Sequence, residues 1–133
     1  MANLQLIFRE QDVLAFKKHW ADFVDRYSTS PGYLPSFIDY LLAYSTDLTT
    51  DKSFVVLKND EVVGCVFLPI EERGGKPSIS IAGSFCPAPI WLDQKSLEQA
   101  VMAHIDEIAA SEQIEKIMFR IDPLERERYS YNF

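Results

Sequence analysis

The feature that most constrains the fold is a pair of β-rich runs joined by a very short polar turn. Residues 53–58 and 62–68 are rich in valine, phenylalanine and leucine, and Asn59-Asp60-Glu61 separates them. β-branched and aromatic residues favour strands, and so short a turn places two strands side by side. The segment therefore predicts a β-hairpin, and Gly64 in its second strand indicates a bulge or a close approach of another backbone.

Helical periodicity predicts three helices around this hairpin. Residues 11–27 carry apolar side chains at helical spacing, and Pro35 stands where the first turn of a second helix accepts proline. A third helix follows Asp93, which is placed to cap it. The buried stripe predicted for that helix consists of Leu97, Val101, His104, Ile105 and Ile108.

Further β-rich runs complete the pattern. Residues 4–8, 78–82 and 114–121 are predicted strands, whereas residues 46–52 indicate a polar loop and residues 71–76, with Gly74-Gly75, a turn. The run at 78–82 would extend the hairpin into a three-stranded antiparallel meander. We therefore predict an α+β fold, a mixed and mostly antiparallel sheet with flanking helices, in the order β-α-α-β-β-β-α-β.

Length and charge limit the classes of function. The 133 residues correspond to one domain, which we expect to span residues 1–124, with 125–133 as a charged and aromatic tail leading into a further part. The formal charge of −7 argues against general binding to nucleic acid or to anionic membranes. Apolar runs too short for a bilayer, together with only two cysteines, Cys65 and Cys86, predict a cytoplasmic protein with reduced thiols.

The junction from Gly83 to Trp91 bears on cofactor binding. Strand-to-helix turns often hold phosphate on the free N–H groups of the helix. This junction contains Pro87 and Pro89, which have no N–H to donate, and it lacks a glycine-rich loop. No metal site is expected either, because no Cys, Asp or Glu stands at metal-ligand spacing from His104.

The order of elements resembles the first two thirds of the GNAT acyltransferase fold, and the hairpin with its Val62-Val63-Gly64 looks like that family's second and third strands. A closer likeness is to the FemAB-type branch of acyl- and aminoacyl-transferases. It lies in Gly83 with Pro87-Ala88-Pro89, in Ile121-Asp122-Pro123 and in Tyr131-Asn132. The resemblance implies the front part of a GNAT-like domain, incomplete at its C-terminus, from a transferase that acts on an amine. Such a part is expected to be inactive alone.

The resemblance also implies where a cofactor would bind. Acetyl-CoA-dependent GNAT members carry a glycine-containing loop ahead of the third helix, and its backbone N–H groups hold the pyrophosphate. This sequence has Ile90-Trp91-Leu92-Asp93-Gln94-Lys95 there, without glycine. Asp93 would occupy the terminal amides and repel a phosphate. We therefore expect no cofactor, and acetyl-CoA is not expected to bind in the family's usual mode.

Two groups of residues are candidates for the chemistry. Glu71 lies where some GNAT enzymes place a general base, although its neighbours Arg73 and Gly74-Gly75 favour a solvated turn. Backbone donors from Gly83, Ser84 and Phe85 would polarise a carbonyl, as an oxyanion hole does.

Aromatic residues are candidates for an acceptor groove. Tyr33, Tyr40 and Trp91 would line it, since aromatic side chains supply binding area with some polar reach. Packing of the same rings in the core is the stronger interpretation.

Two other functions stay open. One is a non-catalytic GNAT-like module that binds a partner or forms a homodimer through an exposed sheet edge. The other is a small-molecule N-acetyltransferase that uses acetyl-CoA at a different pyrophosphate site.

Overall fold

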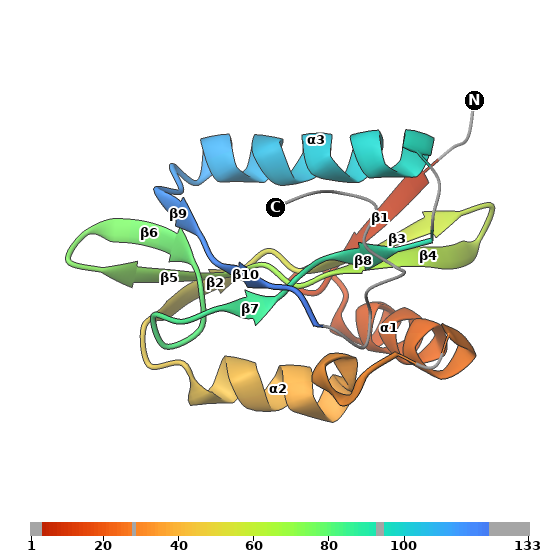
Figure 1. Ribbon diagram of the computed structural model, residues 1–133, viewed down its shortest axis with the longest axis horizontal. Helices are drawn as coiled ribbons and strands as arrows, with labels where there is room; N and C mark the ends of the chain where they lie inside the picture. The colour runs from red at the N-terminus through yellow and green to blue at the C-terminus, as the bar shows by residue number, and fades with distance from the viewer. Residues whose placement is uncertain (1–3, 28, 93–94, 123–133) are drawn as a thin grey trace.

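The centre of the structure is a sheet whose long strands are each broken into shorter ones. The computed structural model describes residues 4–27, 29–92 and 95–122, and the side chains of residues 95 and 96 are not described. Within these residues the fold is a mixed α+β arrangement (Figure 1). The helices are α1 (Val13–Tyr27), η1 (Pro31–Tyr33, a 3-10 turn), α2 (Pro35–Tyr44) and α3 (Lys95–Ser111).

Strand pairing is antiparallel, except where a strand that precedes α3 in the chain pairs with one that follows it. The strands are β1 (Leu4–Phe8), β2 (Leu48–Asp51), β3 (Phe54–Lys58), β4 (Glu61–Val66), β5 (Pro69–Arg73), β6 (Lys76–Ile79), β7 (Cys86–Pro87), β8 (Ile90–Trp91), β9 (Lys116–Ile117) and β10 (Phe119–Arg120). They pair in the orders β1-β3-β4-β8, β2-β5-β6-β9 and β10-β7. Only β6 with β9 and β7 with β10 are parallel among the pairs of the described strands.

Helices cover both faces of this sheet. Figure 1 shows α3 on one face and α1 with α2 on the other. Helix α1 buries Phe16, Trp20, Phe23 and Val24, and α3 buries Leu97, Val101 and Ile105. Consecutive residues of β3 and β4 are therefore buried on alternate faces, which explains their continuous apolar sequence.

The predicted hairpin is confirmed, with both features expected at its glycine. Asn59 and Asp60 adopt φ values of 52° and 65°, the left-handed pair that a two-residue hairpin turn requires. The register shifts between Val56 and Leu57, which is the bulge. A Cβ on Gly64 would lie 3.2 Å from the Cβ of Trp91, so β8 also approaches the backbone closely here.

The break between β2 and β3 is organised by the buried carboxylate of Asp51. Its Oδ1 accepts hydrogen bonds from Ser53 Oγ at 2.5 Å and from Ser53 N at 3.1 Å, and Arg9 Nη1 lies 3.4 Å from Oδ2. Ser53 Oγ in turn accepts a hydrogen bond from Leu68 N at the neighbouring break. Burial raises the pKa of Asp51, and the bonds from Ser53 and the charge of Arg9 only partly oppose that effect.

Two sequence predictions about the strands are wrong. Residues 48–51 form β2 and are not a loop, because Leu48 and Thr50 pair with β5. Residues 69–73 form β5, so the predicted turn at 71–76 shrinks to Gly74-Gly75. The predicted meander is present along the broken strands, since β3 pairs with β4, and β6 pairs with β5, which follows β4 in the chain.

The junction between residues 83 and 91 also differs from the prediction of a plain strand-to-helix turn. It contains β7 and β8, which pair with β10 and β4. The predicted strand at 114–121 is present in part, as β9 and β10. The stripe of α3 is confirmed for Leu97, Val101 and Ile105, while His104 and Ile108 are half-buried.

Asp93, the predicted cap of α3, lies outside the described residues, as does the tail at 125–133. Among the helices that are described, none has the length and apolar character needed to cross a membrane.

The core supports a stability prediction on α1. Phe23 is fully buried, so Phe23→Ala should lower the free energy of unfolding by about 3–5 kcal/mol. Leu14→Ala on the same helix, where the side chain is 80% exposed, should change it by less than about 0.5 kcal/mol. Urea unfolding followed by circular dichroism measures both, and equal losses would contradict this packing.

Candidate functional site

Residues 80–85, between β6 and β7, form a loop outside the sheet. The residues on either side of this loop both bond to one residue of the neighbouring strand, Met118. Met118 N donates to Ile79 O at 3.0 Å, and Cys86 N donates to Met118 O at 2.7 Å. The strand formed by β6 and β7 therefore continues along β9 and β10 with six residues looped out at its middle. We call residues 80–85 the excursion.

The excursion is a tight turn held by its own backbone. Ile81 N donates to Ser84 O at 3.0 Å, and Ser84 N donates to Ile81 O at 2.8 Å. Between them Ala82 and Gly83 have φ values of 51° and 73°, in the left-handed region. Successive residues in such conformations turn their N–H groups toward one side, which makes a small site for an anion.

The carboxylate of Glu71 fills that site. Glu71 comes from β5 and is completely buried. Its oxygens accept hydrogen bonds from Ser80 Oγ and Ala82 N, both at 2.6 Å, and from Gly83 N at 3.0 Å. Ser45 Oγ, just beyond the end of α2, donates to the same carboxylate. A single side chain thus joins β5, α2 and the excursion.

The surroundings keep Glu71 charged and the nearby thiol neutral. Burial alone would raise the pKa of Glu71, but the hydrogen bonds from Ser45, Ser80, Gly83 and Ala82 together lower it below its ordinary value. Burial, with the charge of Glu71, raises the pKa of Cys86 well above its ordinary range. A thiol in that state is no nucleophile at neutral pH.

The structure places Glu71 differently from the solvated turn that its neighbours indicated. A solvated turn is wrong for Glu71, because its side chain is buried and water is excluded from it. The interpretation holds for Glu72, which is exposed. The role of general base stays a prediction. The sequence pattern gave no sign that Ser45 and Ser80 would meet this carboxylate.

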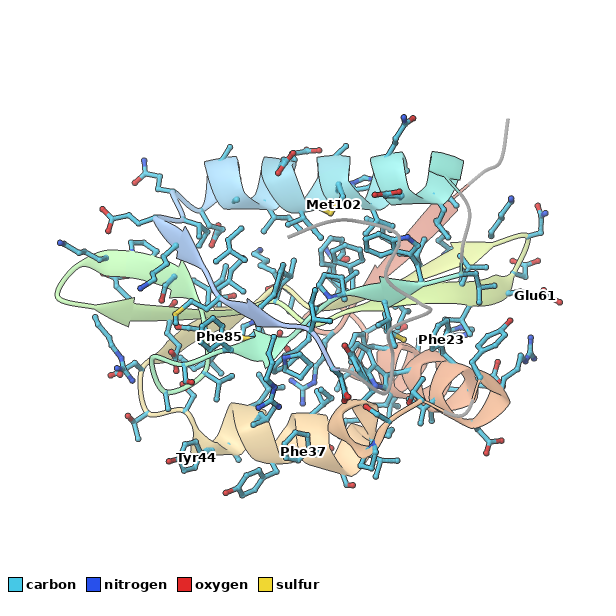
Figure 2. The ribbon with its side chains drawn as sticks, in the orientation of Figure 1. Phe23, Phe37, Tyr44, Glu61, Phe85 and Met102 are labelled. Atoms are coloured by element: carbon cyan, nitrogen blue, oxygen red, sulfur yellow. The ribbon has the colours of Figure 1, made fainter. Side chains whose placement is uncertain are left out.

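The structure brings Gly83, Ser84 and Phe85 together in the excursion. The N–H groups of Gly83 and Ser84 donate within the protein, to Glu71 and to Ile81 O. The side chain of Phe85 is 54% exposed (Figure 2). The excursion therefore presents an aromatic side chain outward while its first two candidate donors face inward.

A cation lies beside the excursion. A Cβ on Gly83 would stand 2.4 Å from Nη1 of Arg73, so the guanidinium lies directly against the glycine backbone. Arg73 Nε pairs with Asp47 Oδ2 at 2.6 Å, and about half of the arginine side chain is exposed. The outer surface of this site thus combines Arg73 with Phe85.

The expected aromatic groove does not form from its three predicted members. Tyr33 and Trp91 are buried in the core, where the Tyr33 hydroxyl donates to Ala88 O at 2.6 Å. Tyr40 instead lies on the outer face of α2, 58% exposed and stacked on Phe37 and Tyr44. Core packing, the stronger interpretation of these rings, is thus confirmed for Tyr33 and Trp91 and wrong for Tyr40.

In the part of the chain that the structure describes, no three His, Cys, Asp or Glu side chains gather in a way that could hold a metal ion. Comparison with protein families found no model that matches the sequence, and no curated protein or solved structure matches it significantly. The geometry of the chain itself therefore carries the functional proposal.

The Glu71 network leads to a prediction about stability and pH. Glu71→Gln replaces an acceptor-only group and leaves donors of the excursion unpaired, so the free energy of unfolding at pH 7 should fall by about 3 kcal/mol. Glu72→Gln, at the exposed neighbouring position, should have almost no effect. Urea unfolding measures both variants.

The pKa of folded Glu71 lies below its ordinary value of 4.5, so its contribution is complete above that pH and is lost as the pH falls through the folded value. The difference between wild type and Glu71→Gln should therefore shrink as the pH is lowered below 4.5. Asp51 is common to both proteins and cancels in the difference. A difference that stays constant with pH would contradict a charged, hydrogen-bonded Glu71.

Proposed function

We propose that this chain is the N-terminal part of an acyl- or aminoacyl-transferase of the GNAT-like, FemAB type, acting on an amine acceptor. The support is the order of elements: a strand and two helices, then antiparallel strands, then α3 and a final strand. When the broken strands are joined, β2 with β3, β4 with β5, and β6 with β7 and β8, this order agrees with the one that the resemblance implies.

The observation that carries the proposal is the parallel pairing of β6–β7 with β9–β10 across α3. Binding residues commonly lie on loops that a rigid scaffold positions. The excursion is such a loop, because it interrupts the strand formed by β6 and β7 beside this parallel pairing. A substrate there would meet Arg73 and Phe85.

The reaction needs few protein groups. The nitrogen lone pair of the amine attacks the acyl carbon of an ester or thioester donor and forms the C–N bond. The C–O or C–S bond breaks, and the departing oxygen or sulfur takes up the proton that the nitrogen loses, which gives an amide and an alcohol or thiol. In this proposal Glu71 fixes the excursion, and Arg73, whose Nε pairs with Asp47, offers the Nη groups of its guanidinium to an anionic donor.

The test uses the product of the whole gene. Incubation with thioester and aminoacyl-ester donors and a set of amines should yield amides detectable by mass spectrometry, while the 133-residue chain alone should yield none. Arg73→Gln should lower kcat/KM about tenfold, as loss of a charged contact of roughly 1.4 kcal/mol would. Lys76→Gln, which removes an exposed cation nearby, is the control. Absence of any amide product with the whole gene product would overturn the proposal.

Acetyl-CoA as the donor is the third function left open by the sequence. A ligand at 100 times its Kd stabilises the folded state by about 2.7 kcal/mol, which raises Tm by several degrees. A specific cofactor at about 1 mM would exceed its Kd by such a factor. We expect no shift of Tm with acetyl-CoA at this concentration. A clear rise of Tm would support the N-acetyltransferase function instead.

A non-catalytic dimerisation module is the second candidate, favoured by the edge of the sheet at β9 and β10. Both strands lie at the end of their strand orders, and no described strand pairs with their outer side. The backbone N–H and C=O of Met118 bond to β6 and β7. Because these groups alternate in direction along a strand, those of Ile117 and Phe119 point away from the sheet. The side chains of Ile117 and Ile121 are each 39% exposed. Such an edge can pair with a second chain.

If the edge mediates dimerisation, sedimentation equilibrium should give the mass of a dimer, and Ile117→Lys should give a monomer by placing like charges at the interface. Leu14→Lys on the exposed side of α1 should leave the dimer intact. A wild-type chain that is monomeric at about 100 μM, well above the Kd of most stable dimers, would rule out this candidate.

A further inference from the structure

A cavity of about 320 Å³ lies between β1 and the C-terminal half of α3. Figure 1 shows α3 on the opposite face of the sheet from α1 and α2, so this cavity is on the α3 side. Its volume is at the lower end of the range for small-molecule sites. It shares no lining residue with the excursion or with the contacts of Glu71.

One part of the cavity wall is apolar. Leu6 and Phe8 come from β1, and Ile108 comes from α3. All three side chains are half-buried, so they retain surface that a ligand can cover. Removing such surface from water stabilises a complex by about 25 cal/mol for each Å² of apolar area.

The polar part of the wall carries an excess of negative charge. Glu10, Glu107 and Glu112 line the cavity, and the basic side chains in its lining are Lys52 and His104. Lys52 Nζ lies 2.8 Å from Glu10 Oε1, so these two charges largely neutralise each other. The hydrogen bond with Glu10 also raises the pKa of Lys52, which keeps the ammonium charged.

Lys52 does not balance the remaining carboxylates. Within the described residues, neither Glu107 nor Glu112 lies within ion-pair distance of a lysine, arginine or histidine, although the charge of Glu112 also raises the pKa of Lys52. Glu107, near the end of α3, and Glu112, just beyond it, both border the opening of the cavity. A positive group placed there would meet two carboxylates, whereas an anion would be repelled.

We propose that this cavity binds a small amine that is protonated at neutral pH and carries an apolar group. The ammonium lies toward Glu107 and Glu112, and the apolar group covers Leu6, Phe8 and Ile108. A neutral apolar molecule would gain only the second contact. The inference concerns a different part of the molecule from the transferase proposal and does not depend on it.

The test uses the intact chain and 2-phenylethylamine as the probe, with 2-phenylethanol and 3-phenylpropanoate as the neutral and anionic counterparts. Amide chemical shifts in two-dimensional NMR should move at Gln11, Ser111 and Glu112, which border the cavity. Loss of a partly exposed ion pair costs up to about 1 kcal/mol, so the alcohol should bind about fivefold more weakly than the amine. The propanoate should cause no localised shifts.

Variants of the two glutamates test whether their charge, and not the shape of the cavity, favours the amine. Glu107→Gln with Glu112→Gln should weaken the amine about fivefold and leave the alcohol unchanged, by the same ion-pair argument. Asp106→Asn is the matched control, because Asp106 is an exposed carboxylate next to Glu107 that does not line the cavity. Equal affinity for amine and alcohol, shifts away from the cavity, or identical effects of the double variant and the control would each overturn the inference.

Discussion

The arrangement of half the sheet depends on one buried carboxylate. Glu71 accepts hydrogen bonds from two backbone N–H groups and two serine hydroxyls that belong to separate segments. A buried ion is costly unless donors surround it, and here the donors are numerous enough to keep it ionised. The excursion and the end of α2 are consequently fixed relative to β5 by polar contacts, whereas α1 and α3 are fixed by apolar packing.

Asp51 shows how the balance changes when fewer donors are present. Both carboxylates are buried near breaks in long strands, but Asp51 has Ser53 and a more distant Arg9 in place of four close donors. Burial then dominates, and the pKa of Asp51 rises while that of Glu71 falls. The pKa values of these two buried carboxyl groups thus shift in opposite directions because their immediate neighbours differ. Both nevertheless serve the same purpose, since each satisfies backbone or hydroxyl donors where regular pairing stops.

Local patterns predicted the elements whose signals are local. The hairpin and the close approach at Gly64 follow from residues within one short stretch. The same holds for the apolar stripe of α3. Strand β2 was missed because Thr49, Thr50 and Asp51 are polar, and only its partner β5 makes the strand stable.

The candidate site was less predictable, because its contacts join distant parts of the sequence. Glu71 was singled out for its position, but its partners at Ser45 and Ser80 are 26 and 9 residues away. Tyr33 carries the same phenol ring as Tyr40, and Trp91 is also aromatic. Nothing in their local sequence distinguishes rings that fill the core from a ring that faces water. Periodicity assigns a residue to a face of an element, and tertiary packing decides what covers that face.

One residue, Met118, bridges the two ends of the excursion through its N–H and its C=O, and this has an evolutionary consequence. Because Ile79 and Cys86 both bond to the same residue, the register of β7 on β10 does not depend on how many residues lie between them. The tip itself is constrained, because Ala82 N and Gly83 N must reach the carboxylate of Glu71. A change of the exposed Phe85 side chain leaves both the strand register and these contacts in place, so this is a position where new specificity can arise while the sheet stays unchanged.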